Sequence, residues 1–502
     1  MKKWISSAVI YQVNLRALAS RAPRNAIEAT REKGAPALSP LAYVAGNLKA
    51  LRALGVNVLY LMPPYPIGIK GRKGIGSPYS SRDFRAVEPE YGTLEDLAEL
   101  VRRAHRCRMR VILDITPNHT SRDHAWCSFR PEYYVKNPDG SIFYDCDWSD
   151  TAKLDYTNPA LREEMISVYD YWLSFLGADT EGRPDGVDGF RLDMAHFIND
   201  RGFWNEAVAR LRTRHAHREL LFLAECYGTQ NNMDLFGRGL NAAYDDDFYK
   251  VCQYLYALDE NGDSVIAPAL EAASNADFLD KYEAFKAGGI AAAFETALLN
   301  YESLLPPGDA GPFLARYTDN HDEGRGLYRF GAGAVQAVNR LIFMCSHCIP
   351  FILTGQEFGA MNRPSIHERI GPCDKGSRIV GARGARAREG VEFEGNLFAR
   401  GFEARRQWYA FYRELIAFRL HHRELQRGKL FLLNAGEDCA PAERSVIAFE
   451  RRTRSAAMRC AVNLGPELRA LKEASLFSGE VLYGGLKGDA LPPFSAVAVR
   501  VQ

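Results

Sequence analysis

The sequence predicts an α/β protein built on a closed (β/α)₈ barrel, with a small inserted subdomain after strand three and a C-terminal β-sandwich. Short apolar runs alternate with longer amphipathic segments over about the first 400 residues. Alternating strands and helices imply a parallel sheet, and so many units in one region favour a closed barrel over an open sheet. No G-x-G-x-x-G follows the first run, which lowers the dinucleotide-binding alternative.

The predicted barrel strands are short runs of apolar, often β-branched residues. They are Ala8–Val13, Val56–Met62, Val111–Ile115, Val187–Leu192, Leu220–Ala224, Phe313–Thr318 and Pro350–Leu353. Between the strands, an apolar residue every three or four positions predicts amphipathic helices. The helices are Leu94–Arg106, Asn158–Phe175, Gly202–His215 and Ala332–Met344.

Two segments interrupt the alternation. Residues 118–156 show no helical pattern, and a loop of that length in a compact barrel is usually functional or a small subdomain. After a predicted helix at Gly401–His421, short strands separated by turns predict a β-domain. Gly371–Gly390, rich in Gly and Arg, is expected to be an exposed loop. The predicted domains are the barrel at 1–117 and 157–425, the inserted subdomain at 118–156 and the β-sandwich at 426–502.

Composition excludes several classes of partner. With 63 basic and 62 acidic residues the formal net charge is +1, which gives no electrostatic reason to expect nucleic acid or an anionic membrane. No run of about 18 apolar residues appears, so no membrane span is expected. Nothing in the sequence indicates the oligomeric state.

Cysteine spacing bears on the compartment. The ten cysteines are scattered and do not form the pattern of a secreted disulfide framework, so we predict a cytoplasmic protein with reduced thiols. Cys345 and Cys348 form a C-x-x-C within an apolar run. We interpret them as buried structural thiols rather than as a metal or redox pair.

Polar residues gather where predicted strands end. They are Asp114, Asn118, His119, Asp193, Glu225, Asp319, Asn320, His321 and Asp322. In a (β/α)₈ barrel these ends share one face, which carries the active site. One Asp there is often only a helix cap, but several acids and histidines at four strand ends cannot all be caps.

Paired carboxyl groups point to a reaction class. Retaining glycosidases need two carboxyl groups about 5–5.5 Å apart, one as nucleophile and one as acid/base. Arg191 lies two residues before Asp193, so the two share a strand face and Arg191 can keep that carboxylate ionised.

These segments resemble, in order and strand context, the four signature segments of the α-amylase family. The matching segments are Asp114…Asn118-His119, Gly189-Phe190-Arg191-Leu192-Asp193, Glu225 and Asn320-His321-Asp322. Further family segments are resembled by Val9-Ile-Tyr-Gln12, by Gly55–Pro64, by Gly76-Ser-Pro-Tyr79 with Asp83, and by Thr354-Gly-Gln-Glu357. The resemblance covers essentially the whole chain and implies a retaining, α-glucan-active glycoside hydrolase.

The resemblance also implies catalytic roles. Asp193 would attack the anomeric carbon, and Glu225 would protonate the leaving oxygen and later activate water. Asp322 would hold the 2- and 3-hydroxyls of the distorted sugar.

Further residues would bind the substrate by the same resemblance. His119 and His321 would donate hydrogen bonds to the same sugar, and Tyr79 would stack beneath it. Arg191 would position the nucleophile. Family members often have Lys-His where this chain has His196-Phe197, so His196 is expected at the first leaving-group subsite, where acceptor handling would differ.

The expected substrate is an α-1,4-linked glucan of the starch type or a maltooligosaccharide, and the expected reaction is hydrolysis. A glucanotransferase or an exo-acting α-glucosidase would use the same residues, and the sequence leaves these alternatives open. A non-catalytic carbohydrate-binding relative is disfavoured because Asp193, Glu225 and Asp322 are all present.

No cofactor is predicted. Many members of the family bind Ca²⁺ through the Asn that corresponds to Asn118, an acidic residue near the fourth strand and backbone carbonyls. Here Lys153 stands at the acidic position, and an ammonium has no lone pair for a metal. A shift of two residues in the alignment would place Asp155 there instead and leave calcium possible.

Overall fold

The computed structural model describes residues 3–21, 39–258, 276–306, 311–361, 366, 406–434 and 436–501. The segment Gly371–Gly390 and the beginning of the helix predicted from Gly401 lie outside these residues. The chain divides into two compact units, residues 1–244 with 352–406 and residues 245–351 with 407–502.

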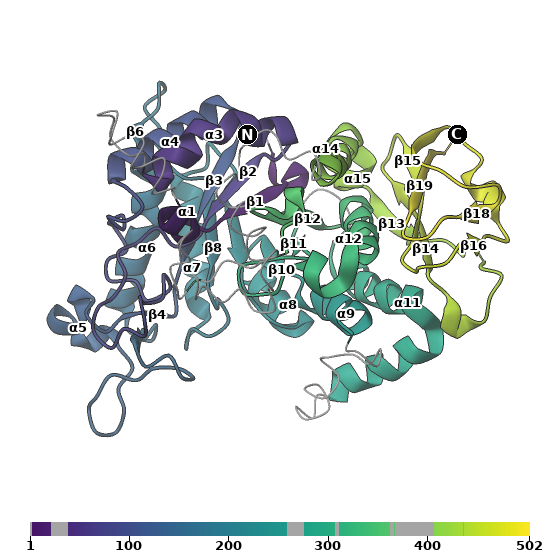
Figure 1. Ribbon diagram of the computed structural model, residues 1–502. Coiled ribbons are helices and arrows are strands. Elements are labelled where there is room, and N and C mark those ends of the chain that lie inside the picture. The colour runs from purple at the N-terminus through teal and green to yellow at the C-terminus, as the bar shows by residue number, and fades with distance from the viewer. Residues whose placement is uncertain are drawn as a thin grey trace. The chain divides into compact units, whose positions relative to one another are not determined.

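Eight parallel strands form the closed barrel that the sequence predicts (Figure 1). The order around the barrel is β1-β12-β11-β10-β9-β8-β3-β2. The strands are β1 Ile10–Val13, β2 Val58–Leu61, β3 Arg110–Ile115, β8 Gly189–Leu192, β9 Leu221–Ala224, β10 Ala242–Tyr244, β11 Phe313–Arg316 and β12 Cys348–Leu353. Almost every strand residue is buried, which explains why the runs are continuously apolar instead of alternating.

Strand β10 is absent from the predicted set. It has only three residues, and two of them, Ala242 and Ala243, have little intrinsic preference for strands. Its neighbour β9 holds it in place, with Ala242 opposite Leu223 and Ala243 opposite Ala224. Tertiary pairing rather than local sequence therefore makes this strand.

The amphipathic segments are helices close to their predicted bounds. Helix α4, Leu94–Arg106, has the predicted range because Thr93 and Asp96 form a capping box at its start. Helices α6 Pro159–Ser174 and α7 Gly202–Arg214 also match. Helix α12 Gly326–Met344 is interrupted at Gly331, whose φ of 79° and ψ of 163° are not helical, so its second part begins at the predicted Ala332. The other described α-helices are α1 Leu15–Arg21, α3 Pro40–Leu54, α5 Ala125–Phe129, α8 Thr229–Gly237, α9 Asp246–Tyr256, α11 Ala276–Leu304, α14 Arg406–His421 and α15 Arg423–Arg427.

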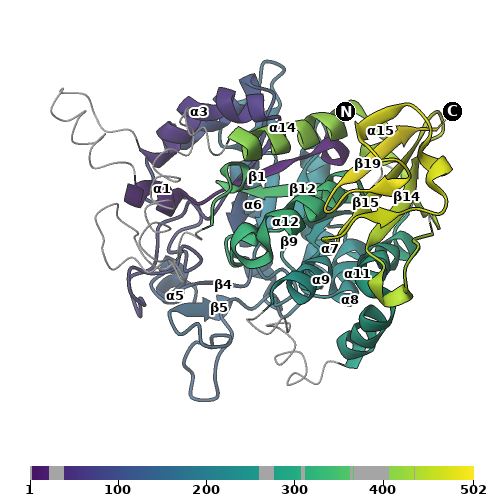
Figure 2. The same cartoon turned by 45° about the vertical axis from the view of Figure 1, so that its right-hand side comes forward.

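The segment between β3 and α6 is a compact excursion of the first unit. Its two ends lie side by side as the antiparallel strands β4 His119–Ser121 and β5 Thr151–Lys153 (Figure 2). It also contains the short helix α5. Five residues are too few to show a helical period in the sequence, so this helix was not predicted. The predicted limits of this subdomain, 118–156, stay a prediction, but the β4–β5 pairing closes the segment near them.

The C-terminal part is antiparallel. Five strands form a sheet in the order β13-β14-β15-β19-β17 and two more form a separate ribbon. The strands are β13 Lys429–Leu432, β14 Val446–Arg452, β15 Ala457–Asn463, β17 Val481–Gly484 and β19 Ala496–Arg500 in the sheet, with β16 Arg469–Ala470 and β18 Ala490–Leu491 in the ribbon. A shared apolar core, including Val446, Leu471, Phe477, Leu491 and Val499, packs the sheet against its loops.

Two expectations from composition concern described residues. Among the described helices, none has both the length and the apolar content to cross a membrane. Cys345 and Cys348 are both buried and free. Burial raises the pKa of Cys345, but the Cys348 hydrogen bond and the Arg316 and Arg419 charges outweigh it and lower that pKa to about 5. Arg316 Nη1 lies 2.9 Å from the Cys345 sulfur.

Candidate active site

A buried guanidinium connects three carboxyl groups in the first unit. Arg191, on β8, is fully buried. Its Nη1 donates to Asp114 Oδ1 at 2.9 Å and to Asp193 Oδ1 at 2.8 Å, and its Nη2 lies 2.8 Å from Glu225 Oε2. Three carboxyl groups around one cation carry negative charge in excess, the sign that favours a developing sugar cation.

Sheet register brings Asp193 and Glu225 together. Leu192 at the end of β8 pairs with Ala224 at the end of β9, and the two acids are the next residues on each strand. Neighbouring strands lie about 4.8 Å apart, close to the roughly 5–5.5 Å that a retaining carboxyl pair requires. The register of two adjacent strands therefore sets the geometry of the pair.

The two acids also influence each other's ionisation. Burial and the nearby Glu225 carboxylate raise the pKa of Asp193 well above its usual range, and the Arg191 charge opposes that rise. Two carboxyl groups this close hold a proton between them more readily than they ionise together. A double displacement needs one member of such a pair as the carboxylate and the other as the carboxylic acid.

The backbone after Asp193 takes an uncommon conformation. Met194 has φ 43°, in the left-handed region that non-glycine residues rarely adopt. In this conformation its N–H donates to Glu225 Oε2 at 2.9 Å. The strained residue thus links the loop of one acid to the carboxyl group of the other.

Tyr227 lies beside the second acid. Its hydroxyl donates to Glu225 Oε1 at 2.9 Å, and its ring is 40% exposed. His196 packs edge-on against the Tyr227 ring with centroids 5.6 Å apart, and its Nδ1 has no hydrogen-bond partner among the described residues. Burial, followed by the Arg201 charge, lowers the pKa of His196. An aromatic pair with a spare ring nitrogen therefore borders Glu225.

Tyr79 joins the same network from the loop after β2. Its hydroxyl donates to Asp114 Oδ2 at 2.9 Å, and the Arg191 guanidinium lies 5.5 Å from its ring centroid. Tyr60, on β2, also donates to Asp114 Oδ2, and Arg191 lies 5.5 Å from the Tyr244 ring as well. Asp114 therefore anchors both Arg191 and Tyr79.

His119 begins β4 and is buried. Its ring packs against Trp148 of the inserted segment, which in turn stacks on Phe197 of the loop after β8. Burial lowers the pKa of His119 to about 4, although Asp145 and Asp150 oppose this. The ring is therefore neutral at pH 7, when one nitrogen donates and the other accepts.

His321 and Asp322 belong to the second unit. His321 Nε2 lies 3.0 Å from Asp322 Oδ2, and the Asp322 side chain is 42% exposed, so it is open to a ligand. Asn320 Oδ1 accepts hydrogen bonds from the backbone N–H groups of Asp322 and Glu323 and fixes this turn.

Sequence reasoning did not identify every residue of the network. Tyr79, Arg191, Asp193 and Glu225 were predicted, and the structure links them through Arg191, which contacts each of the other three. Asp114 was predicted only as one of the polar residues at strand ends, without a role. The tyrosines that border the network, Tyr60, Tyr227 and Tyr244, were not singled out. Tyr227 offered a signal, because it is two residues beyond Glu225, whereas Tyr60 and Tyr244 resemble ordinary core residues.

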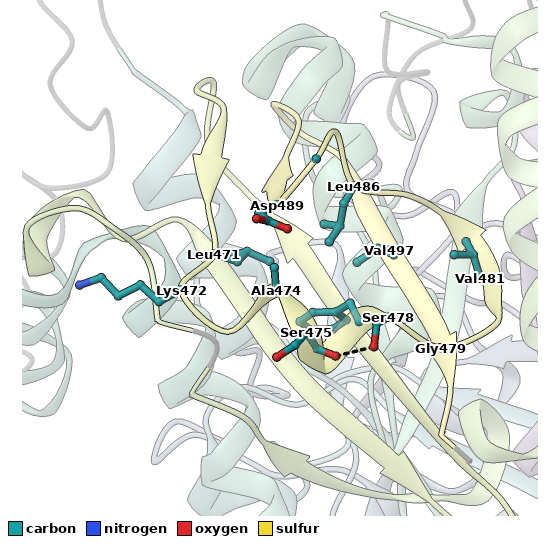
Figure 3. A pocket seen from close by; sticks show the side chains of 12 residues that line it. Leu471, Lys472, Ala474, Ser475, Ser478, Gly479, Val481, Leu486, Asp489 and Val497 are labelled. Carbon is teal, nitrogen blue, oxygen red and sulfur yellow. Dashed lines mark hydrogen bonds between the residues drawn. The ribbon is translucent and has the colours of Figure 1, made fainter.

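A separate pocket lies in the C-terminal part of the second unit, with a volume of about 620 Å³ (Figure 3). Leu471, Phe477 and Val497 line it together with Lys472 and Asp489. One carboxylate cannot supply both a nucleophile and an acid/base, so this pocket does not offer the chemistry of the Asp193–Glu225 pair.

Comparison with known proteins places the sequence in a family context. A family model described as "Alpha amylase, catalytic domain" matches residues 39–144 and 132–424, which together exceed half of the chain. The match includes all the residues of the network around Arg191.

Curated relatives include hydrolases and transferases. The chain is 30% identical over 307 residues to an alpha-1,4-glucan:maltose-1-phosphate maltosyltransferase of Arcanobacterium haemolyticum, covering 55% of this chain and 42% of that protein. It is 24% identical over 387 residues to alpha-amylase 3 of Dictyoglomus thermophilum, covering 71% and 65%. The chain thus spans less than two thirds of the length of these relatives.

Solved structures share the fold. An alpha-amylase from Lactobacillus plantarum superimposes with a TM-score of 0.67 at 24% identity, covering 100% of both chains.

Proposed function

Because this chain belongs to the α-amylase family, we propose that it hydrolyses α-1,4-glucosidic bonds in starch-type glucans or maltooligosaccharides with retention of configuration. The observation that carries the proposal is the Asp193–Glu225 pair, which follows two paired strand residues and contacts one buried guanidinium. Both groups are almost wholly buried, which strengthens their electrostatic action on a bound sugar.

In this proposal Asp193 and Glu225 act in two steps. Asp193 attacks the anomeric carbon while the bond to the leaving oxygen breaks, and Glu225 gives its proton to that oxygen. A water then loses a proton to Glu225 and attacks the anomeric carbon, which releases Asp193. The first step requires Asp193 to be the carboxylate and Glu225 to carry the proton.

We propose that the remaining residues hold the sugar. His119 and His321 donate to its hydroxyls, Tyr79 stacks beneath it, and Asp322 accepts from the 2- and 3-hydroxyls. The spare Nδ1 of His196 faces a polar group of the leaving-group sugar. These roles predict a raised KM or a lowered kcat for each alanine variant.

A glucanotransferase is the second candidate. Its support is the maltosyltransferase relative and the aromatic pair His196–Tyr227, which would help to bind an acceptor sugar beside Glu225. An exo-acting α-glucosidase would use the same residues, and a non-catalytic role is the least favoured.

A product time course separates these candidates. Starch, maltotriose and isomaltose are incubated with the purified chain, and Asp193→Asn prepared identically controls for contaminating amylase. Hydrolysis predicts only shorter products from maltotriose, whereas longer oligomers would indicate transfer. Release of glucose alone from starch would indicate an exo-acting glucosidase, and no product from any substrate would contradict the proposed function.

The cytoplasmic location is also part of the proposal and rests on the scattered spacing of the cysteines in the sequence. Fractionation of the source cells tests it, with activity expected in the cytosolic fraction.

A further inference from the structure

The inserted segment carries a nearly buried ion pair at its base. Lys153, the last residue of β5, places Nζ 2.7 Å from Asp145 Oδ1 and 2.9 Å from Asp145 Oδ2. The two side chains are only 12% and 16% exposed. The same ammonium donates to the backbone carbonyl of Phe197 at 3.2 Å. Lys153 therefore ties the inserted segment to the loop that follows the proposed nucleophile.

Asn118 completes the cluster from the end of β3. Its Nδ2 donates to Asp145 Oδ2 at 2.8 Å. Its Oδ1 is buried and has no hydrogen-bond partner among the described residues. The end of β3, the inserted segment and the loop after β8 thus meet around the Lys153–Asp145 ion pair. The Asn118 Oδ1 beside it lacks a hydrogen bond within the described residues.

The cluster does not fit the calcium ion that the family implies. Calcium takes six to eight oxygen ligands at about 2.3–2.6 Å. Here the Asp145 carboxylate and the Phe197 carbonyl already bond an ammonium, a donor that would repel the ion. In the described part of the chain, no three His, Cys, Asp or Glu side chains lie close enough together to hold a metal.

The other carboxylate near this strand is engaged elsewhere. Asp155 accepts hydrogen bonds from Thr157 and from Asn199 Nδ2 at 2.7 Å. It serves the turn before α6, so the two-residue shift that would make it a calcium ligand has no support in the geometry.

We propose that Lys153 is a built-in cation that replaces calcium in this chain, fastening the inserted segment to the barrel loops through Asp145 and Phe197. A tethered ammonium has one advantage over an ion, since it cannot dissociate or be chelated. Its position also explains the orientation of Asp145, whose two oxygens bind one cation and one amide.

The proposal predicts that a single substitution will make the stability of the chain depend on calcium. Lys153→Met removes the charge but keeps much of the apolar stem. It leaves an uncompensated carboxylate among the Asn118 oxygen, the Phe197 carbonyl and water, which is a set of oxygen ligands for calcium. Calcium binding would then restore stability by mass action.

Thermal unfolding of the full chain tests this in EDTA, in CaCl₂ and in MgCl₂. The parent is expected to have the same Tm in all three solutions. The control Lys136→Met, which alters an exposed lysine of the same segment, is also expected to have one Tm in all three. Lys153→Met is expected to have a lower Tm in EDTA and to regain part of the loss in CaCl₂ but not in MgCl₂. Calcium titration of Lys153→Met should saturate at one site per chain, with no binding to the parent.

A second variant keeps the test decisive if Lys153→Met does not fold. Lys153→Met/Asp145→Asn removes both charges and is expected to fold without calcium and to ignore EDTA. A parent whose Tm falls in EDTA and returns with calcium would overturn the proposal. So would Lys153→Met with the parent's Tm and no response to calcium. These measurements need no substrate, so a negative result for the Lys153 proposal is distinguishable from a failure of the proposed hydrolysis.

Discussion

At the scale of single residues, Arg191 determines the charge balance of the candidate site. Burial alone would lower its pKa, yet the Asp114 and Glu225 carboxylates outweigh burial and raise it well above its usual range. The guanidinium therefore stays charged, and three carboxyl groups surround this one cation. An excess of acidic groups is suited to an oxocarbenium-like transition state.

Asp193→Asn tests the nucleophile. The amide cannot form the covalent intermediate, so turnover should fall by several orders of magnitude, to about 10⁻⁴ of the parent or less, while the circular dichroism spectrum is unchanged. Asp147→Asn, at a side chain that is 91% exposed, should retain parental turnover. Activity of Asp193→Asn within about tenfold of the parent would assign the nucleophile elsewhere.

Tyr227→Phe tests a residue that the structure adds. Loss of the hydroxyl removes a hydrogen bond that orients Glu225, so kcat should fall about tenfold, less than for loss of the acid itself. Tyr144→Phe, which removes a hydroxyl from a partly exposed tyrosine of the inserted segment, is the matched control. Equal kcat values for parent and Tyr227→Phe would show that the hydroxyl has no positioning role.

Residues differ in how far the sequence alone reveals them. Asp193 and Glu225 could be predicted because each follows an apolar run directly, and that position has a known meaning in a barrel. Asp145 could not be predicted as the partner of Lys153. The pairing depends on a turn within the inserted segment that brings residues eight positions apart face to face, and no periodicity encodes that turn.

At the scale of elements, short pieces escaped prediction because tertiary contacts make them. Strand β10 depends on β9, and helix α5 has too few residues for a period to emerge. By contrast, α4 carries its own capping box and apolar face, so local sequence defines where it begins and which side it buries. Element boundaries were predicted well where neighbouring residues in the sequence set them, and less well where pairing with a distant strand sets them.

Helix α5 makes a prediction about pH. His124 caps it by accepting the Trp126 N–H at Nδ1, and burial lowers the His124 pKa to about 4, although Asp83 and Asp123 oppose this. In the unfolded chain His124 binds a proton below its ordinary pKa of about 6.5, whereas in the folded chain it binds one only below about pH 4. Stability that is present above pH 6.5 is therefore lost as the pH falls towards 4.

His124→Asn isolates this contribution, since Asn caps helices and does not titrate. Urea unfolding between pH 4 and 6.5 should show a smaller loss of unfolding free energy in His124→Asn than in the parent. His421→Asn, at an exposed position, controls for removal of a histidine. If the unfolding free energy of His124→Asn falls with pH as steeply as that of the parent, the cap does not depend on a neutral ring.

At the scale of the whole molecule, the barrel could be predicted because alternation of strand and helix persists over most of the chain. Its closure also determines the chemistry, since β8 and β9 are neighbours and their last residues are paired. Two acids that are far apart in sequence thereby follow directly on neighbouring strand ends, which lie about 4.8 Å apart. Sequence could suggest this pairing but not its register, which depends on hydrogen bonding between the strands.

The anomeric configuration of the first product tests the central claim most directly. Proton NMR of a maltooligosaccharide digest, recorded before mutarotation, distinguishes the two anomers of the newly formed reducing end. Double displacement by Asp193 and Glu225 predicts that the α-anomer appears first and the β-anomer grows in later. A product that appears first as the β-anomer would show inversion and contradict the assignment of Asp193 as nucleophile.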